Sequence, residues 1–160
     1  MAANYPLDPS TFTSLGASPF GAAGTYTINA SKNNATPILT KPDNTTINGV
    51  FFNSSGGEIA VFTFNTIDIP ANVTVQGLRN ANSRPIALLS KGNITIAAAG
   101  SLSTDGSINS TTGNVSITAL NGMSFGDDVT AAGTLSLSST NANIVQTAGS
   151  MLVGGAATIN

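Results

Sequence analysis

The sequence predicts an all-β fold of the β-solenoid type, in which successive turns of the chain stack on one another. Three observations lead to this prediction. A short phrase recurs at a nearly constant spacing, apolar and hydroxyl residues alternate within each copy, and only 8% of the 160 residues are charged. Typical globular domains contain roughly 25% charged residues. A chain of this length is large enough to bury one continuous core.

The recurring phrase sets the length of one turn of the solenoid, which we call a rung. Successive copies begin 21, 21, 20 and 22 positions apart. The copies occupy residues 72–75, 93–96, 114–117, 134–137 and 156–159. This period fits a rung of two or three short strands joined by tight corners. We expect the solenoid to span residues 25–160 and to be most regular from residue 70 onward.

Within each copy, apolar residues alternate with Thr or Ser, which is the pattern of a strand with one buried face. We therefore expect the aliphatic side chains to point inward and the hydroxyl residues to point to water. Copies stacked about 4.8 Å apart would form a parallel sheet with aliphatic columns inside. The expected outward column contains Thr74, Thr95, Ser116, Ser136 and Thr158.

The segments between the copies supply two further sides of the solenoid. The second side is expected at 101–102, 123–125 and 144–145, and the third at Ile108, Val129 and 151–153.

Glycine and asparagine mark the start of the phrase. Gly92, Gly113, Gly133 and Gly155 directly precede four of the copies. We expect them to supply a positive φ at a corner, which glycine adopts without steric cost. The asparagines that follow have two interpretations: stacked amides that hydrogen-bond along a ladder, or ordinary turn residues. They are Asn72, Asn93 and Asn114.

The N-terminal third of the chain is less regular. Residues 1–24 contain three prolines and two phenylalanines and are expected to form an irregular cap. Residues 25–29 and 45–48 resemble incipient rungs. Residues 49–53 and 59–70 are rich in strand-forming residues and contain four of the seven phenylalanines. This aromatic cluster is expected where one end of the solenoid needs covering.

The composition excludes several classes of protein. The chain has neither Cys nor His, which removes disulfides, thiolate metal sites and the commonest general base. Five cationic residues are too few for a nucleic-acid surface. No apolar run approaches the length of a membrane span. We expect no cofactor.

With these segments identified, the chain resembles bacterial β-strand-repeat exoproteins of the filamentous-haemagglutinin and autotransporter-passenger type. The phrases that carry the resemblance lie at 84–106, 113–122 and 133–160, with "GVFFN" (49–53) resembling an opening segment. The NPNG-type motifs of two-partner secretion domains are missing. The resemblance implies a right-handed parallel β-helix at, or released from, the bacterial cell surface.

Acidic residues supply a weak candidate site. Asp127 and Asp128 are an adjacent acidic pair that would bind calcium, or with Asp105 would cleave a polysaccharide. The alternative is a solvated turn.

Basic and hydroxyl residues supply candidate binding surfaces. Arg79, Arg84 and Lys91 would grip a sugar acid or lie on a solvated loop. The outward hydroxyl column would contact a ligand, but as a single file mixed with Ser it falls short of an ice-binding face.

The function expected from the sequence is a secreted or surface-exposed structural or adhesive β-helix, the N-terminal part of a larger exoprotein that binds host or matrix glycans or proteins. Three alternatives stay open: a filament subunit that self-associates end to end through an uncapped C-terminal rung, a polysaccharide lyase or hydrolase, and an ice-binding protein.

Overall fold

The structure of the chain, a computed structural model, describes residues 7–54, 57–78, 82–104 and 107–160. In these residues one short 3-10 helix, η1 (Pro9–Thr11), precedes eighteen β-strands. The fold is all-β, and its parallel sheets stack in a repeating pattern consistent with a β-solenoid, as the sequence predicted.

Five successive turns of the chain form the stack. Their strands are β5 (Gly57–Phe64), β6 (Ile67–Ile69) and β7 (Val73–Gly77); β8 (Ile86–Ser90), β9 (Ile94–Ala98) and β10 (Leu102–Thr104); β11 (Ile108–Ser110), β12 (Val115–Ala119) and β13 (Met123–Phe125); β14 (Val129–Ala131), β15 (Leu135–Ser139) and β16 (Ile144–Gln146); and β17 (Met151–Val153) and β18 (Ala157–Ile159).

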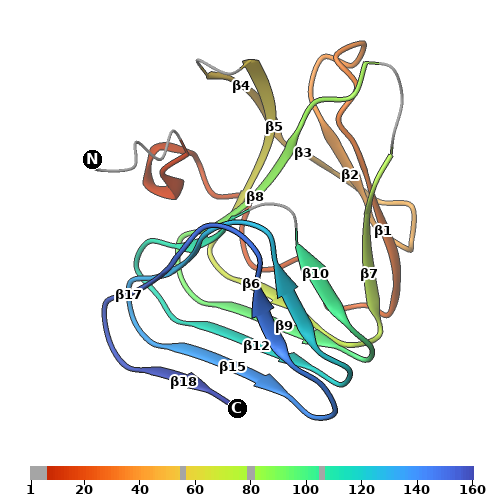
Figure 1. The fold of residues 1–160 in the computed structure, drawn as a ribbon. Helices are drawn as coiled ribbons and strands as arrows, with labels where there is room; N and C mark the ends of the chain where they lie inside the picture. Colours follow the sequence, from red (N-terminus) through yellow and green to blue (C-terminus); the bar gives the residue numbers. More distant parts are fainter. Residues whose placement is uncertain (1–6, 55–56, 79–81, 105–106) are drawn as a thin grey trace.

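Apart from β7, equivalent strands of successive rungs pair in parallel and make three walls. One wall is β6-β9-β12-β15-β18, the second is β5-β8-β11-β14-β17 and the third is β10-β13-β16. Figure 1 shows strands of the first wall lying side by side toward the C-terminus. In that wall Ile94 lies opposite Val115, which lies opposite Leu135. The steps are 21 and 20 residues, so the predicted period is confirmed.

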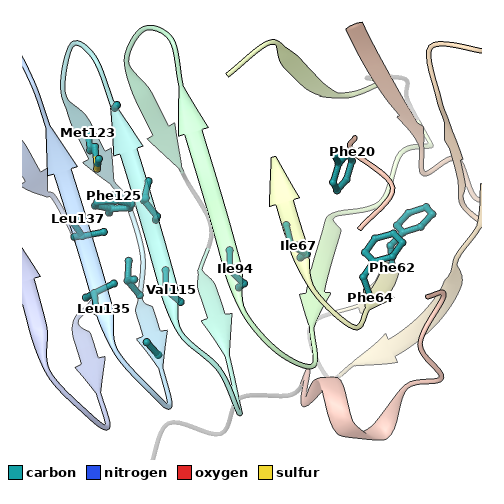
Figure 2. Packing of buried hydrophobic residues seen from close by; sticks show 14 of the residues in the cluster. Phe20, Phe62, Phe64, Ile67, Ile94, Val115, Met123, Phe125, Leu135 and Leu137 are labelled. Atoms are coloured by element: carbon teal, nitrogen blue, oxygen red, sulfur yellow. The ribbon is translucent and has the colours of Figure 1, made fainter. Parts of the chain in front are cut away.

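Alternation within each strand produces the core. Val115 and Ile117 of β12 are buried, whereas Ser116 between them is half-buried and Thr118 is exposed. The inward side chains of Ile67, Ile94, Val115 and Leu135 form a row through successive rungs (Figure 2). The predicted second and third sides are also confirmed, because Leu102 pairs with Met123 and Val129 pairs with Met151.

The first rung differs from the prediction. Residues 72–75 do not lie below residues 93–96; Ile67 and Ile69 of β6 lie opposite Ile94 and Ile96 instead. The segment containing Thr74 forms β7, which pairs in parallel with β1 (Gly24–Asn29). The error has a simple physical cause. Alternation identifies a strand with one buried face but does not identify the strand beside it.

Residues 45–48 are not a rung, which corrects a second prediction, whereas residues 25–29 stack in parallel on β7 but continue into antiparallel strands. β1, β2 (Ile38–Thr40) and β3 (Thr46–Asn48) pair with one another in antiparallel fashion. β4 (Val50–Ser54) forms an antiparallel hairpin with β5. These strands lie at the end of the molecule away from the C-terminus (Figure 1).

Aromatic side chains pack beside the first rung. Phe20 is fully buried and lies edge-on to Tyr26 and Phe64, with ring centroids 5.1 and 6.1 Å apart. The Tyr26 hydroxyl hydrogen-bonds to backbone atoms of Pro19 and Ala22. Residues 7–23 contain η1 and no strand, and Phe20 anchors them to the core.

Backbone groups of the N-terminal segment also close the edge of the first rung. The Leu15 N–H donates to the Thr63 carbonyl, and the Asn65 N–H donates to the Gly16 carbonyl, both at 2.7 Å. The Ser18 hydroxyl bonds to both the N–H and the carbonyl of Asp68 at 3.0 Å. With β1 on β7 and β4 on β5, each strand of the first rung has a partner on its outer edge.

The corner glycines are required for close approach, which corrects the expected positive φ. Gly92, Gly113, Gly133 and Gly155 are not among the residues with positive φ. A Cβ on Gly113 would lie 2.7 Å from the Asn93 nitrogen, and one on Gly133 would overlap the Asn114 Oδ1 atom. Real Cβ contacts essentially never fall below 3.0 Å.

The asparagines act between rungs, but not as an amide ladder. Asn93 Oδ1 accepts from the Asn114 N–H at 2.9 Å, and Asn114 Oδ1 accepts from the Thr134 N–H at 2.8 Å. Asn72 lies outside this column, since its carbonyl accepts from Gly24 of β1. In each Gly-Asn pair, the Asn side-chain oxygen therefore accepts from a backbone N–H of the next rung. The Gly, which has no Cβ, lets the backbone of a neighbouring rung come close.

The inward column gives a first prediction. Replacing Ile117, which is 0% exposed, with Asp buries an unpaired carboxylate and should lower the free energy of unfolding by about 3 kcal/mol or more. The adjacent exposed Thr118→Asp should change it by less than about 0.5 kcal/mol. Urea unfolding measures both. Equal losses would contradict the assigned facing of β12.

The corner gives a second prediction. Gly133→Ala should cost about 1–3 kcal/mol because the added methyl group overlaps Asn114 Oδ1. In an Asn114→Ala background the same change should cost less, since that oxygen is gone, with a coupling of more than about 0.5 kcal/mol. Gly100→Ala, where nothing lies within 4 Å, is the control. Identical costs of Gly133→Ala in the two backgrounds would refute the steric explanation.

Candidate binding surface

The outer side of the β9-β12-β15-β18 wall carries two parallel files of small side chains, which we call the hydroxyl face. Strand register aligns the files from rung to rung. The first file is Thr95, Ser116, Ser136 and Thr158, and the second is Ala97, Thr118 and Ser138. β6 places Asp68 in line with the first file.

Sheet geometry turns the two files into a lattice. Neighbouring strands lie about 4.8 Å apart, and residues two positions apart along a strand are separated by roughly 6.6 Å. A repeating polymer or crystal surface with matching spacing would meet several hydroxyl groups at once.

The hydroxyl groups of the face are available for intermolecular bonds. Thr95, Thr118 and Thr158 are exposed, and Ser116, Ser136 and Ser138 are half-buried. Within the part of the chain that the structure describes, none of these six hydroxyls makes an intramolecular hydrogen bond. From β9 onward the face has no charged side chain, so it suits a neutral ligand better than an ionic one.

The sequence identified only part of this surface. Thr95, Ser116 and Ser136 do lie in one file, whereas Thr74 belongs to β7 and lies opposite Thr25. The predicted inclusion of Thr74 in the column is therefore wrong. The second file was missed, although its signal was present: Thr118 and Ser138 stand two positions after members of the first file.

The predicted basic residues occupy different surroundings. Arg84 Nε lies 3.1 Å from Glu58 Oε2 in an ion pair. Lys91 stands in the turn between β8 and β9, and its carbonyl accepts from the Thr112 hydroxyl. Hydrogen bonds from Ser10 lower the pKa of Asp8, and the charge of Lys91 contributes less to this shift. Arg79 lies outside the described residues, and anionic-sugar binding by these three residues stays a prediction.

The Asp127–Asp128 pair forms local and rung-to-rung hydrogen bonds. Asp127 Oδ1 accepts from the Asp128 N–H at 2.8 Å. Asp128 Oδ1 accepts from the N–H and the hydroxyl of Ser150, one rung later, at 2.7 and 3.0 Å. Asp105 lies outside the described residues. Among the described residues no group of three or more acidic, His or Cys side chains is placed to hold a metal ion.

Comparisons with known proteins add no assignment. No protein-family model matches the sequence, and no curated protein or solved structure matches the chain. In the described segments no helix is long and apolar enough to span a membrane.

The acidic pair gives a third prediction. Asp128→Ala removes two hydrogen bonds that join successive rungs and should lower the free energy of unfolding by about 1–2 kcal/mol. Calcium chloride or a chelator should leave the melting temperature of the unmodified chain unchanged. A calcium-dependent rise that disappears in Asp128→Ala would instead assign the carboxylates to a metal site.

Proposed function

We propose that this chain belongs to a secreted or surface-exposed structural and adhesive β-helix, in which the hydroxyl face binds a neutral glycan or protein of a host or matrix. The observation that carries this proposal is the regular double file of hydroxyl groups that make no bonds within the described chain. Hydroxyls in this arrangement donate and accept hydrogen bonds, while the threonine methyl groups contact apolar patches of a sugar ring.

Repetition explains how such a face would bind. A single hydrogen bond contributes only about 0.5–1.5 kcal/mol net. Six hydroxyls fixed on one rigid sheet reach a repeating ligand together, so weak contacts combine without a deep pocket. The outward side chains of the face are short, and little side-chain entropy is lost on binding.

The finer fold assignment belongs to the same proposal. Parallel crossover connections are right-handed in almost all known cases, and we assign that hand to the rungs. A right-handed parallel β-helix with an N-terminal cap also matches the resemblance to filamentous-haemagglutinin-type and autotransporter-passenger exoproteins. The low charge and the hydroxyl-rich exterior are in keeping with a surface-displayed rod.

Binding to ice is a second candidate, favoured by a specific observation. The face carries two files rather than the single file expected from the sequence, which gives it a two-dimensional repeat. Two residues interrupt this repeat: Ala97 stands in the second file where a hydroxyl residue would continue it, and Asp68 adds a charge in line with the first file.

A head-to-tail filament is not favoured. Stacking would require a free parallel edge on the first rung, but β7 pairs with β1, β5 pairs with β4, and Ser18 bonds to the backbone of β6. The described first-rung strands therefore have their outer edges occupied.

Retention on solid supports tests the proposal. The unmodified chain should be retained on at least one neutral support from a panel of cellulose, chitin, starch and collagen. Thr118→Glu places a charge within the hydroxyl face and should weaken retention about tenfold, equivalent to roughly 1.4 kcal/mol. Ser103→Glu, outward on the different wall formed by β10, is the matched control.

The outcomes separate the candidates. Loss of retention in Thr118→Glu but not in Ser103→Glu supports adhesion through the face. Equal retention of both variants, or no retention of the unmodified chain on any support, contradicts it. Thermal hysteresis that Thr118→Glu abolishes would assign the face to ice.

A further inference from the structure

Two Asn-Gly pairs occur in the sequence, and the structure places them in opposite surroundings. They are Asn48–Gly49 and Asn121–Gly122. An asparagine followed by glycine is prone to spontaneous deamidation, because glycine has no side chain to hinder attack by its own backbone nitrogen on the asparagine side chain. That nitrogen must be free to turn toward the side chain, so local hydrogen bonds decide which pair reacts.

The pair Asn48–Gly49 is held in place. Asn48 is the last residue of β3 and pairs with Ile38 of β2. The Gly49 N–H donates to the Pro37 carbonyl at 2.8 Å. Gly49 is buried, and a Cβ there would lie 2.5 Å from the Val61 carbonyl oxygen, so the backbone is closely packed. We therefore expect Asn48 to be protected from deamidation.

The pair Asn121–Gly122 lies in the corner between β12 and β13, where its backbone is held less firmly. Asn121 is exposed. Gly122 is buried, but in the part of the chain that the structure describes its N–H donates no hydrogen bond. The peptide group that joins the two residues is bonded through the Asn121 carbonyl, which accepts from the Ser101 hydroxyl at 3.2 Å. Rotation of this peptide group therefore breaks one hydrogen bond to a neighbouring rung.

A second observation concerns the side-chain carbonyl that would be attacked. Asn141 Nδ2, one rung later, donates to Asn121 Oδ1 at 3.2 Å. This oxygen gains negative charge when a nucleophile adds to Cγ, so a donor fixed on it stabilises the developing charge. The Asn141 N–H donates to the Leu120 carbonyl at 2.9 Å, which fixes the donor beside Asn121. The stacking of rungs thus places an amide donor on the group under attack.

We infer that Asn121 is a site of spontaneous deamidation in the folded chain, assisted by Asn141. The Gly122 nitrogen gives its proton to solvent and bonds to Asn121 Cγ. The Cγ–Nδ2 bond then breaks and ammonia leaves, which produces a cyclic succinimide. Water opens this ring at Cγ to give aspartate, or at the main-chain carbonyl carbon to give isoaspartate. The net reaction consumes one water and releases one ammonia, with no oxidation or reduction.

Both products change the corner between β12 and β13. Each places a carboxylate beside Asn141, and isoaspartate also adds one atom to the backbone. The Gly122 carbonyl accepts from the Leu102 N–H of the preceding rung at 3.0 Å, so the longer backbone displaces a bond between rungs. The site does not rest on the adhesive function proposed above, and either proposal can fail without the other.

Peptide mapping of aged protein tests the inference. The folded chain is kept in mildly alkaline buffer, digested, and analysed by mass spectrometry with separation of the aspartate and isoaspartate peptides. Deamidation at Asn121 should be at least about fivefold faster than at Asn48, because the Gly49 N–H must first leave its acceptor. In urea the two rates should converge. Equal rates in the folded chain, or no reaction at Asn121, would overturn the inference.

A pair of matched variants tests the role of the donor. Asn141→Ala should slow deamidation at Asn121 about threefold or more. Asn143→Ala removes another exposed asparagine side chain of the same corner, which makes no hydrogen bond within the described chain, and it should leave the rate unchanged. Asn48 in the same molecule reports general loosening, which would raise its own rate. An unchanged or faster reaction at Asn121 in Asn141→Ala would refute the assistance by Asn141.

Discussion

Backbone pairing between successive rungs is the constraint on which the rest of this structure depends. A strand in a parallel stack must find carbonyl and N–H partners both above and below it, or leave polar groups unpaired. In the first wall β12 lies between β9 and β15, and β15 lies between β12 and β18, so near-copies of one strand meet this condition at steps of 21, 20 and 22 residues. Once the register is fixed, inward positions become aliphatic columns and outward positions become files. The hydroxyl face is therefore a direct consequence of the repeat.

The same constraint explains the irregular N-terminal part. The first rung has no earlier copy beneath it, so its outer edges need partners of another kind. Three different solutions occur: β1 on β7, β4 on β5, and the Ser18 hydroxyl on Asp68. The pairing of β7 with β1 takes that strand out of the stack below β10. The first and second rungs consequently differ by 27 residues at Ile67 and Ile94, and regular stacking begins only afterwards.

The sequence predicted the side-chain facing, which depends on local alternation. It did not predict the features that depend on which strands lie next to each other. The facing of Ile94, Val115 and Leu135 follows from a period of two residues, which is visible in the sequence. The placement of Thr74 does not, because alternation alone does not distinguish pairing with β9, as predicted, from the observed pairing with β1. The corner glycines were located correctly but explained wrongly. Close approach between rungs, as at Gly113 and Asn93, is visible only in three dimensions.

A hydroxyl group without a protein partner affects stability differently on the outer side and on the inner side of the walls. Thr118 is exposed, so its hydroxyl can bond to water and the lack of a protein partner costs no stability. On binding a ligand, the hydroxyl gives up that water. Among the described residues Thr104 Oγ1 is buried without a partner, so its unpaired state destabilises the folded chain. Outer sites of this kind bind strongly only through many repeats. Burial therefore decides the cost of an unpaired hydroxyl, which is small on the hydroxyl face and large inside the walls.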